Sequence, residues 1–199
     1  MIGNIVVLII ISSLVSPMYL AIMSPIDTQY VFGNPRPIYF YDVDSSCNPQ
    51  EIKTSLDYIT TQTGVKFFKL WKPVALLGGG IDYTCDEYDG FRVGEDGGYT
   101  SGTAESGYFS IFVWNKIRLY MPDDATIIHE TLHIMSFAHS KNENSIMYPI
   151  GNNWAIEPEL SNFIQKVYVH NPFAYLNTIP VHLLLALLVL FAILTGRGG

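Results

Sequence analysis

The sequence predicts a single mixed α/β (α+β) domain that is flanked by two hydrophobic segments. Strand-like stretches and stretches of helical periodicity follow one another between residues 37 and 170. Uninterrupted apolar runs lie near both ends, and three of the five histidines fall within eleven residues on and just after one expected helix. A chain of 199 residues is long enough for one such domain but not for two.

The two apolar runs, Ile5–Met23 and Ile179–Leu194, contain no Lys, Arg, Asp or Glu. A helix that spans a bilayer needs about 20 apolar residues, with about 17 as a short limit. We expect residues 1–24 to form a signal peptide or a signal anchor, and residues 179–195 to form a transmembrane helix. The alternative is that both runs are buried core helices, but neither has a polar face at helical period.

These runs predict a membrane protein with one or two spans, depending on whether residues 1–24 are cleaved. Arg197 is the sole charge beyond the second run, so we expect residues 196–199 to be a short cytoplasmic tail. The domain at 37–170 would then lie outside the cytoplasm, joined to the hydrophobic segments by linkers at 25–36 and 171–178.

The charge of the chain argues against one class of function, and its cysteine content leaves two structural possibilities open. The chain between residues 24 and 178 has ten of the eleven basic residues and all eighteen acidic residues, a net charge of −8. The remaining basic residue is Arg197. This excess of acid argues against a nucleic-acid surface, which needs clustered positive charge. Cys47 and Cys85 either form one disulfide outside the cytoplasm or remain two small buried residues. Nothing in the sequence indicates the oligomeric state.

The first half of the domain is expected to contain two strands around one helix. IYFYDV (Ile38–Val43) and VKFFKLW (Val65–Trp71) have the composition of strands. Between them, Asn48 followed by a proline is a helix start signal, with Glu51 placed to cap back onto it. Gly64 marks the end of this helix.

The second half is expected to contain two more strands and two helices. IDYTC (Ile81–Cys85) and KIRLY (Lys116–Tyr120) have strand character. MPDD then places acidic residues at the start of a helix with Ile128, Leu132 and Met135 on its apolar face. A last helix is expected to begin near Glu157, with Leu160, Phe163, Ile164 and Val167 on one side.

The histidines give the strongest functional signal. His129 and His133 are four residues apart on the expected helix, so both imidazoles point from one face and can bind one zinc ion. Glu130 occupies the position from which a carboxylate can act on a metal-bound water as general base. His139 can reach the same ion only if the helix stops and the chain reverses. Three protein ligands leave a fourth position for water, as in catalytic zinc sites.

Here the sequence resembles the metzincin metalloproteases, most closely the matrixins. HETLHIMSFAH, followed by SIMYP and later EPELSNFIQKVY, is similar to that family's HExxHxxGxxH helix, methionine turn and closing helix. The resemblance implies a twisted mixed sheet of about five strands, an active-site helix and a C-terminal helix. It also implies a membrane-anchored zinc endopeptidase, with His129, His133 and His139 as zinc ligands and Glu130 as general base and acid.

The resemblance implies further site residues. Met147 would form the turn that supports the histidines, and Tyr148 to Trp154, including Tyr148 and Pro149, would line the pocket for the substrate side chain. A strand near Gly98–Gly102, including Gly98, Tyr99 and Thr100, would be the edge on which an extended peptide substrate pairs. Matrixins also bind calcium in this part of the chain, so the acidic stretch Asp82–Asp96 is either a solvated loop or a Ca²⁺ site.

The chain departs from the family where the helix turns off, because Ser136 stands at the position of the family's glycine. If this residue adopts a positive φ, serine costs about 1 kcal/mol relative to glycine. One alternative for the metal is a third ligand from Glu157 or Glu159, as in thermolysin-like enzymes. The alternative for function is a catalytically silent, zinc-stabilised extracellular binding module tethered to a membrane.

Overall fold

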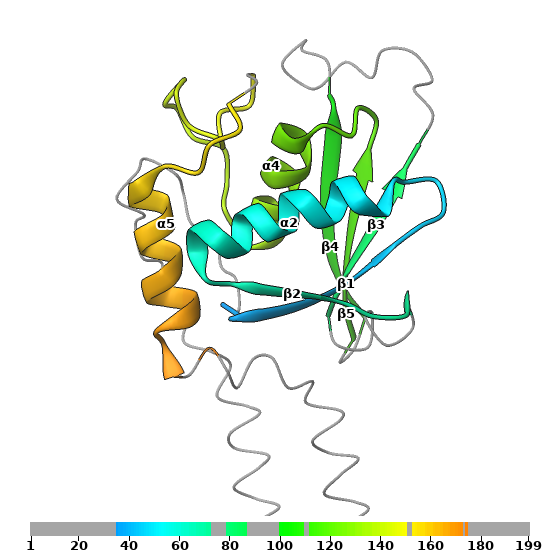
Figure 1. Cartoon of the computed structure of the whole chain (residues 1–199), viewed down its shortest axis with the longest axis horizontal. Helices are drawn as coiled ribbons and strands as arrows, with labels where there is room; N and C mark the ends of the chain where they lie inside the picture. Colours follow the sequence, from blue (N-terminus) through cyan, green and yellow to red (C-terminus); the bar gives the residue numbers. More distant parts are fainter. Residues whose placement is uncertain are drawn as a thin grey trace, which may run out of the picture.

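The computed structural model describes residues 35–72, 79–86, 100–109, 112–150, 153–172 and 174. Within these ranges the chain forms one five-stranded mixed sheet in the order β2-β1-β3-β5-β4. Strands β1 (Ile38–Val43), β2 (Lys66–Lys69), β3 (Ile81–Cys85) and β5 (Phe112–Leu119) are parallel, and β4 (Gly102–Phe109) is the antiparallel edge. The expected α/β class and five-stranded mixed sheet are confirmed (Figure 1).

Three α-helices lie in the part of the chain that the structure describes. Helices α2 (Pro49–Thr63) and α4 (Asp124–Ile134) contact each other on one face of the sheet, and α4 also contacts β4 and β5 (Figure 1). Helix α5 (Pro158–Ile164) packs at the end of α2 and continues as a π-helix, η1 (Gln165–Val169). Parallel strands require a crossover connection, and α2 lies on the one between β1 and β2. Helix α4 follows β5, the last strand of the sheet.

The expected strand positions are correct to different degrees. β1 and β3 have the predicted bounds, whereas β2 starts one residue late and ends two residues early, at Lys69. The strand predicted at 116–120 is β5, which begins four residues earlier than expected and ends one residue earlier. The strand before β5 is β4, which begins at Gly102, so the edge of the described sheet starts at the end of the stretch 98–102 that was expected to form it. Residues 108–109 and 112–114 belong to the ends of the β4–β5 hairpin.

Helix α2 shows how local sequence determines an element. The side chain of Asn48 accepts a hydrogen bond from the backbone N–H of Gln50, and Gly64 ends the helix in the left-handed conformation at φ 78°. Glu51 does not cap the Asn48 backbone as predicted. Its Oε1 instead accepts a 2.8 Å hydrogen bond from the Asn48 side-chain amide. The cap is therefore completed between two side chains.

The hydrophobic core lies between the sheet and the helices. It is built from the inward faces of the strands and the apolar stripes of α2, α4 and α5, as the helical periodicity predicted. Its largest fully buried members include Tyr83, Tyr168, Phe137, Ile52, Leu56, Ile59, Ile117, Ile128 and Leu132. Two polar groups are paired within this core: the hydroxyls of Tyr83 and Thr131 lie 2.9 Å apart, which fixes α4 on β3.

Cys47 and Cys85 form a disulfide, which decides between the two possibilities left open by the sequence. The bond joins the loop before α2 to the end of β3. Cys85 N–H also donates to the Ser46 hydroxyl at 3.0 Å. Disulfides persist in oxidising compartments, so this bond is evidence for a domain outside the cytoplasm.

Among the described residues, no helix has the length and apolar character needed to cross a bilayer. Both apolar runs, the signal sequence or anchor at 1–24 and the helix at 179–195, lie outside the described residues. The linkers at 25–34 and 175–178 and the tail at 196–199 lie outside them too. The predicted domain limits and membrane topology therefore stay predictions.

Candidate metal centre

Helix α4 positions the first two histidines. It begins after Asp123, whose carboxylate accepts a 2.7 Å hydrogen bond from the backbone N–H of Thr126. His129 and His133 then lie one turn apart on a half-buried side of the helix. The helix ends at Ile134, and the residues that follow turn the chain back.

The reversal depends on Ser136, which has a φ of 74°. It is the one residue other than glycine with a positive φ among those described. The turn is closed by hydrogen bonds from Ser136 N–H to His133 O and from Phe137 N–H to Leu132 O. A positive φ is expected at Ser136 if the chain reverses here, and the structure has it. Because serine has a Cβ, this conformation carries a steric penalty that glycine would not have.

Replacing Ser136 by glycine is expected to stabilise the protein by about 1 kcal/mol, because glycine adopts this φ without a steric penalty. Thermal unfolding should show a midpoint about 2–4 °C higher. Ser136→Ala is the control, since alanine retains the Cβ and should bring no such gain. Equal midpoints for the two variants would show that the backbone conformation is not the source of the effect.

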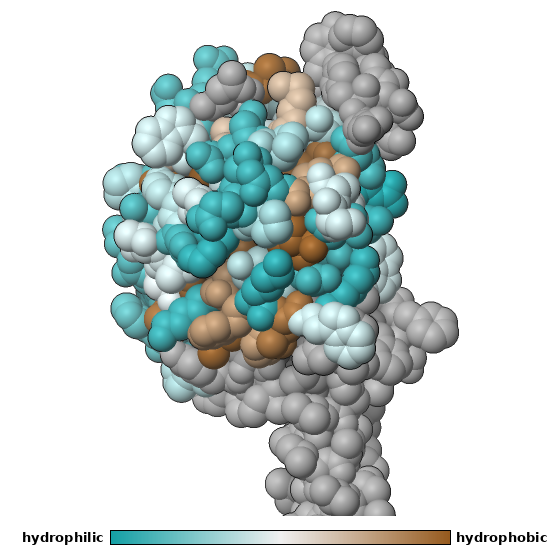
Figure 2. Space-filling view, turned by 45° about the vertical axis from the view of Figure 1, so that its right-hand side comes forward, coloured by the Kyte–Doolittle hydropathy of each residue, from teal (hydrophilic) through white to brown (hydrophobic). Residues whose placement is uncertain are grey.

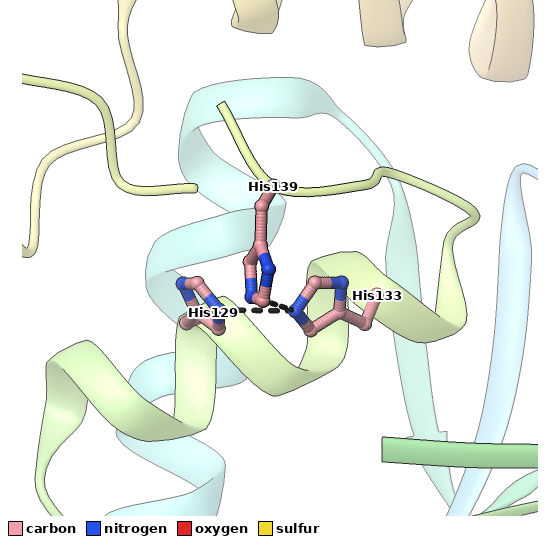
Figure 3. A group of neighbouring side chains, drawn as sticks. All are labelled: His129, His133 and His139. Carbon is pink, nitrogen blue, oxygen red and sulfur yellow. Dashed lines mark hydrogen bonds between the residues drawn. The ribbon is translucent and has the colours of Figure 1, made fainter. Parts of the chain in front are cut away.

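The reversed chain brings His139 back to the other two histidines (Figure 3). His133 Nε2 lies 3.0 Å from His129 Nε2 and 3.2 Å from His139 Nε2. One ring nitrogen from each histidine lies within 4.8 Å of the others. His139 is exposed, so the cluster opens to solvent on its side. The predicted meeting of the three side chains is confirmed.

Backbone carbonyls fix which nitrogen of each helical histidine faces the cluster. His129 Nδ1 donates to Ile146 O and His133 Nδ1 donates to Phe137 O, both at 2.7 Å. A carbonyl oxygen can only accept, so both Nδ1 atoms carry the proton. In a neutral imidazole this leaves Nε2 with a lone pair directed at the cluster.

This arrangement fits a metal ion. Two Nε2 lone pairs that face each other at 3.0 Å repel unless a proton or a cation lies between them. Zinc binds imidazole nitrogen at about 2.0–2.1 Å in tetrahedral geometry, which separates ligand nitrogens by about 3.3 Å. The observed separations of 3.0 and 3.2 Å are close to this value. The nitrogen donor set also suits zinc.

Burial keeps the helical histidines in the form that binds metal. Desolvation lowers the pKa of His133 to about 4, with a further contribution from the nearby His129. Desolvation also lowers the pKa of His129, although its hydrogen bond to Ile146 O acts in the opposite direction. Both rings are therefore neutral at pH 7, and a metal ion need not displace a proton from them.

Glu130 follows His129 on α4, in a desolvated position. Its side chain is 7 % exposed, and burial raises its pKa to about 7. The helix turns it against the start of β4, where Gly102 leaves room for it. A Cβ on Gly102 would lie 2.9 Å from Glu130 Cγ and 2.9 Å from Thr126 Cγ2. Gly102 therefore permits the close approach of α4 to β4 that seats Glu130.

Replacing Gly102 by alanine is expected to lower the free energy of unfolding by about 1–3 kcal/mol, because the new methyl group overpacks this contact. Chemical denaturation of the metal-free protein measures the loss. The same substitution in a Glu130→Ala background should cost less, since one of the two closest atoms is then gone. Equal losses in both backgrounds would show that Glu130 does not resist the added methyl group.

The expected methionine turn is tied to the histidines. Met147 is fully buried, and its carbonyl oxygen accepts a 2.8 Å hydrogen bond from Ser140 N–H, the residue after His139. Its neighbour Ile146 accepts from His129, as described above. The turn around Met147 thus holds His129 directly and holds the segment that carries His139.

The residues expected to form the substrate pocket are only partly described. Tyr148 is half-buried and Pro149 is exposed directly after the turn, and Thr100 precedes β4. Gly98 and Tyr99 lie outside the described residues, as does most of the acidic stretch expected to be a loop or a Ca²⁺ site. The pocket and the calcium site therefore stay predictions.

Glu157 and Glu159 are not members of the cluster, whose third member among the described residues is His139. Sequence reasoning missed the carbonyls of Phe137 and Ile146, and it named Gly102 only as part of the expected edge and not as the residue against which Glu130 packs. A carbonyl has no sequence signal, because every residue carries one. Gly102 had a weak signal, since an isolated glycine in a strand marks a close approach of other atoms.

No protein-family model matches the sequence, and no curated protein is significantly similar to it. The class of the site is therefore defined by its own geometry. The chain has an α/β fold with a five-stranded mixed sheet and a three-histidine centre that could hold a metal ion such as zinc.

Proposed function

We propose that the protein is a zinc-dependent endopeptidase of the metzincin type, closest to the matrixins. The observation that carries the proposal is the convergence of three histidine Nε2 atoms, together with the buried carboxylate of Glu130 directly after His129 on the same helix. A structural zinc site is usually closed by four protein ligands and needs no such acid. Here a zinc ion held by the three histidines, of which His139 is exposed, would keep a fourth coordination position for water.

Zinc held by these histidines would supply a Lewis acid that polarises a peptide carbonyl and increases the acidity of a water molecule. Glu130 has the properties of the general base that such a reaction needs. Its burial brings its pKa to about 7, near the pH at which proton transfer is most efficient. Glu130 would take a proton from the attacking water and deliver it to the leaving amine.

The free edge of the sheet is a suitable place for a peptide. In the described sheet β4 pairs only with β5, so one side of its backbone is available for an extended segment. Gly102, where β4 begins, packs against Glu130, so this edge starts beside the centre. Tyr148 and Pro149, on the far side of the methionine turn, would then line the pocket for the side chain after the scissile bond.

We propose that the domain is extracellular and attached to a membrane. The disulfide between Cys47 and Cys85 supports a place outside the cytoplasm. The two charge-free apolar runs support attachment by one or two spans. The substrate would be a protein or peptide that reaches the β4 edge from the same side of the membrane.

The decisive experiment uses the full-length protein in detergent, a mixed peptide library and added zinc. Wild type is expected to bind one zinc per chain and to cleave the library, and a chelator should stop cleavage. Glu130→Ala should retain zinc but lose about 10²–10⁴-fold in rate, the usual contribution of a general base. Zinc bound at one per chain without cleavage by wild type would instead favour a silent, zinc-stabilised binding module.

A further inference from the structure

The segment KFFKLWK, residues Lys66 to Lys72, has a composition that the metal centre does not explain. It contains three of the chain's eleven basic residues, three aromatic residues and no acid, although the chain as a whole has a net charge of −7. Four of its residues form β2, the edge strand opposite β4. Basic and aromatic side chains thus gather on one edge of an acidic domain.

The structure exposes this composition. Lys66 and Lys69 are exposed, Phe68 is 47 % exposed and Trp71, at 74 %, is the most exposed of the large hydrophobic residues described. Phe68 lies beside Phe40 of β1, with ring centroids 6.4 Å apart, so the aromatic surface continues onto the next strand. On the face of the molecule in Figure 2, hydrophobic residues likewise reach the surface among hydrophilic ones.

The segment is held in place and is not a loose end. Leu70 N–H donates to Tyr41 O at 2.8 Å, and the Lys72 ammonium group lies 2.9 Å from Asp82 Oδ2, on a nearly buried carboxylate of β3. These contacts fix the chain on both sides of Trp71. Because Lys72 is paired with Asp82, Lys66 and Lys69 are the lysines of this segment that remain for an external partner.

The chemistry favours a lipid surface over other partners. Lysines on an edge strand oppose pairing with a second copy of the same strand, because like charges would meet. If the lysines of β2 served only to prevent pairing with a second copy, the exposed Trp71 and Phe68 beside them would have no role. Tryptophan beside lysine is suited to the boundary between headgroups and hydrocarbon, where the ring leaves water and the ammonium group meets anionic lipid.

We propose that the β2 edge docks on the non-cytoplasmic face of the membrane, at anionic lipids exposed on that face. Phe68 and Trp71 would lie at the level of the headgroups, and Lys66 and Lys69 would contact lipid phosphate or carboxylate groups. The contact is weak, at about fivefold in the docking equilibrium per lysine, so it orients a domain that is held at the membrane by other means. Since β2 and β4 are opposite edges of the sheet, docking would leave β4 and the metal centre turned away from the bilayer.

The chain offers its own reporters for a test, because it contains only three tryptophans. In full-length protein, Trp114→Phe with Trp154→Phe leaves Trp71 as the single tryptophan. Trp71→Phe with Trp114→Phe leaves Trp154, which is 61 % exposed and contacts Tyr58 of α2. Both proteins are placed in vesicles of phosphatidylcholine with or without phosphatidylserine, and quenching by lipids with brominated chains is measured.

Trp71 should be quenched more strongly than Trp154, and its quenching should rise with phosphatidylserine. Lys66→Gln and Lys69→Gln should each lower the docked fraction about fivefold at low occupancy, whereas Lys141→Gln, at an exposed lysine outside the segment, should not change it. Equal quenching of the two reporters, or no response to phosphatidylserine, would overturn the proposal. The proposal would also be overturned if the fluorescence of Trp71 changed with protein concentration or added RNA but not with lipid. The test does not depend on peptidase activity.

Discussion

Replacing His139 by alanine is expected to weaken zinc binding by more than about 100-fold while leaving the fold in place. Loss of an outer-shell partner alone lowers metal affinity by about 10–100-fold, and His139 supplies one of the three nitrogens themselves. Because the side chain is exposed, its removal leaves no cavity in the core. Competition with a zinc chelator of known affinity measures the change, and circular dichroism checks the fold.

His170 provides the control for this substitution. It is an exposed histidine directly after η1 and is not part of the cluster. His170→Ala should bind zinc as wild type does. If His139→Ala and His170→Ala bind zinc equally well, the third ligand has been assigned wrongly, and a centre built from His129, His133 and another group would have to replace it.

Removing the disulfide is expected to have the largest effect on stability. The bond joins residues 38 positions apart, and closing a loop of this length in the unfolded chain corresponds to about 4 kcal/mol in the chain-entropy treatment. The double variant Cys47→Ala/Cys85→Ala should therefore unfold about 4 kcal/mol more easily. For a domain of this size, the thermal midpoint should fall by about 10 °C.

Reduction of the wild-type protein is the internal control, because it opens the same bond without a change of sequence. A reducing agent should lower the stability of wild type towards that of the double variant, and should leave the variant unchanged. If reduction has no effect on wild type, the two cysteines are not joined in the folded protein, and the argument for an oxidising compartment loses its support.

Much of this fold could be predicted because its signals are local. The limits of α2 are determined by its own first and last residues and their caps, namely Asn48, Pro49 and Gly64. The periodicity of α4 likewise places the apolar face of that helix on the core. The meeting of His129, His133 and His139 was predictable for a related reason. Two of them share a helix face, and the third needs only one reversal, at Ser136.

Other features depend on tertiary contacts, and sequence patterns did not determine them. Leu70 and Trp71 have strand character, but β2 ends at Lys69. The reason is that Lys69 is the last residue of β2 that pairs with β1. The start of β4 at Gly102 depends on the approach of α4 from a distant part of the chain. Whether Cys47 and Cys85 would pair could not be decided, because their proximity results from the parallel pairing of β1 and β3.

The metal centre has an unusual relation to folding. Its three histidines and the two carbonyls that orient them all lie between residues 129 and 146, whereas the sheet around them joins segments far apart in the chain. Closing loops this short requires little entropy, so the unfolded chain can already chelate zinc with the same imidazoles. Affinity for the unfolded chain subtracts from any stabilisation by the ion. Zinc bound at this centre would therefore protect the domain from denaturation by less than its affinity for the folded protein would suggest.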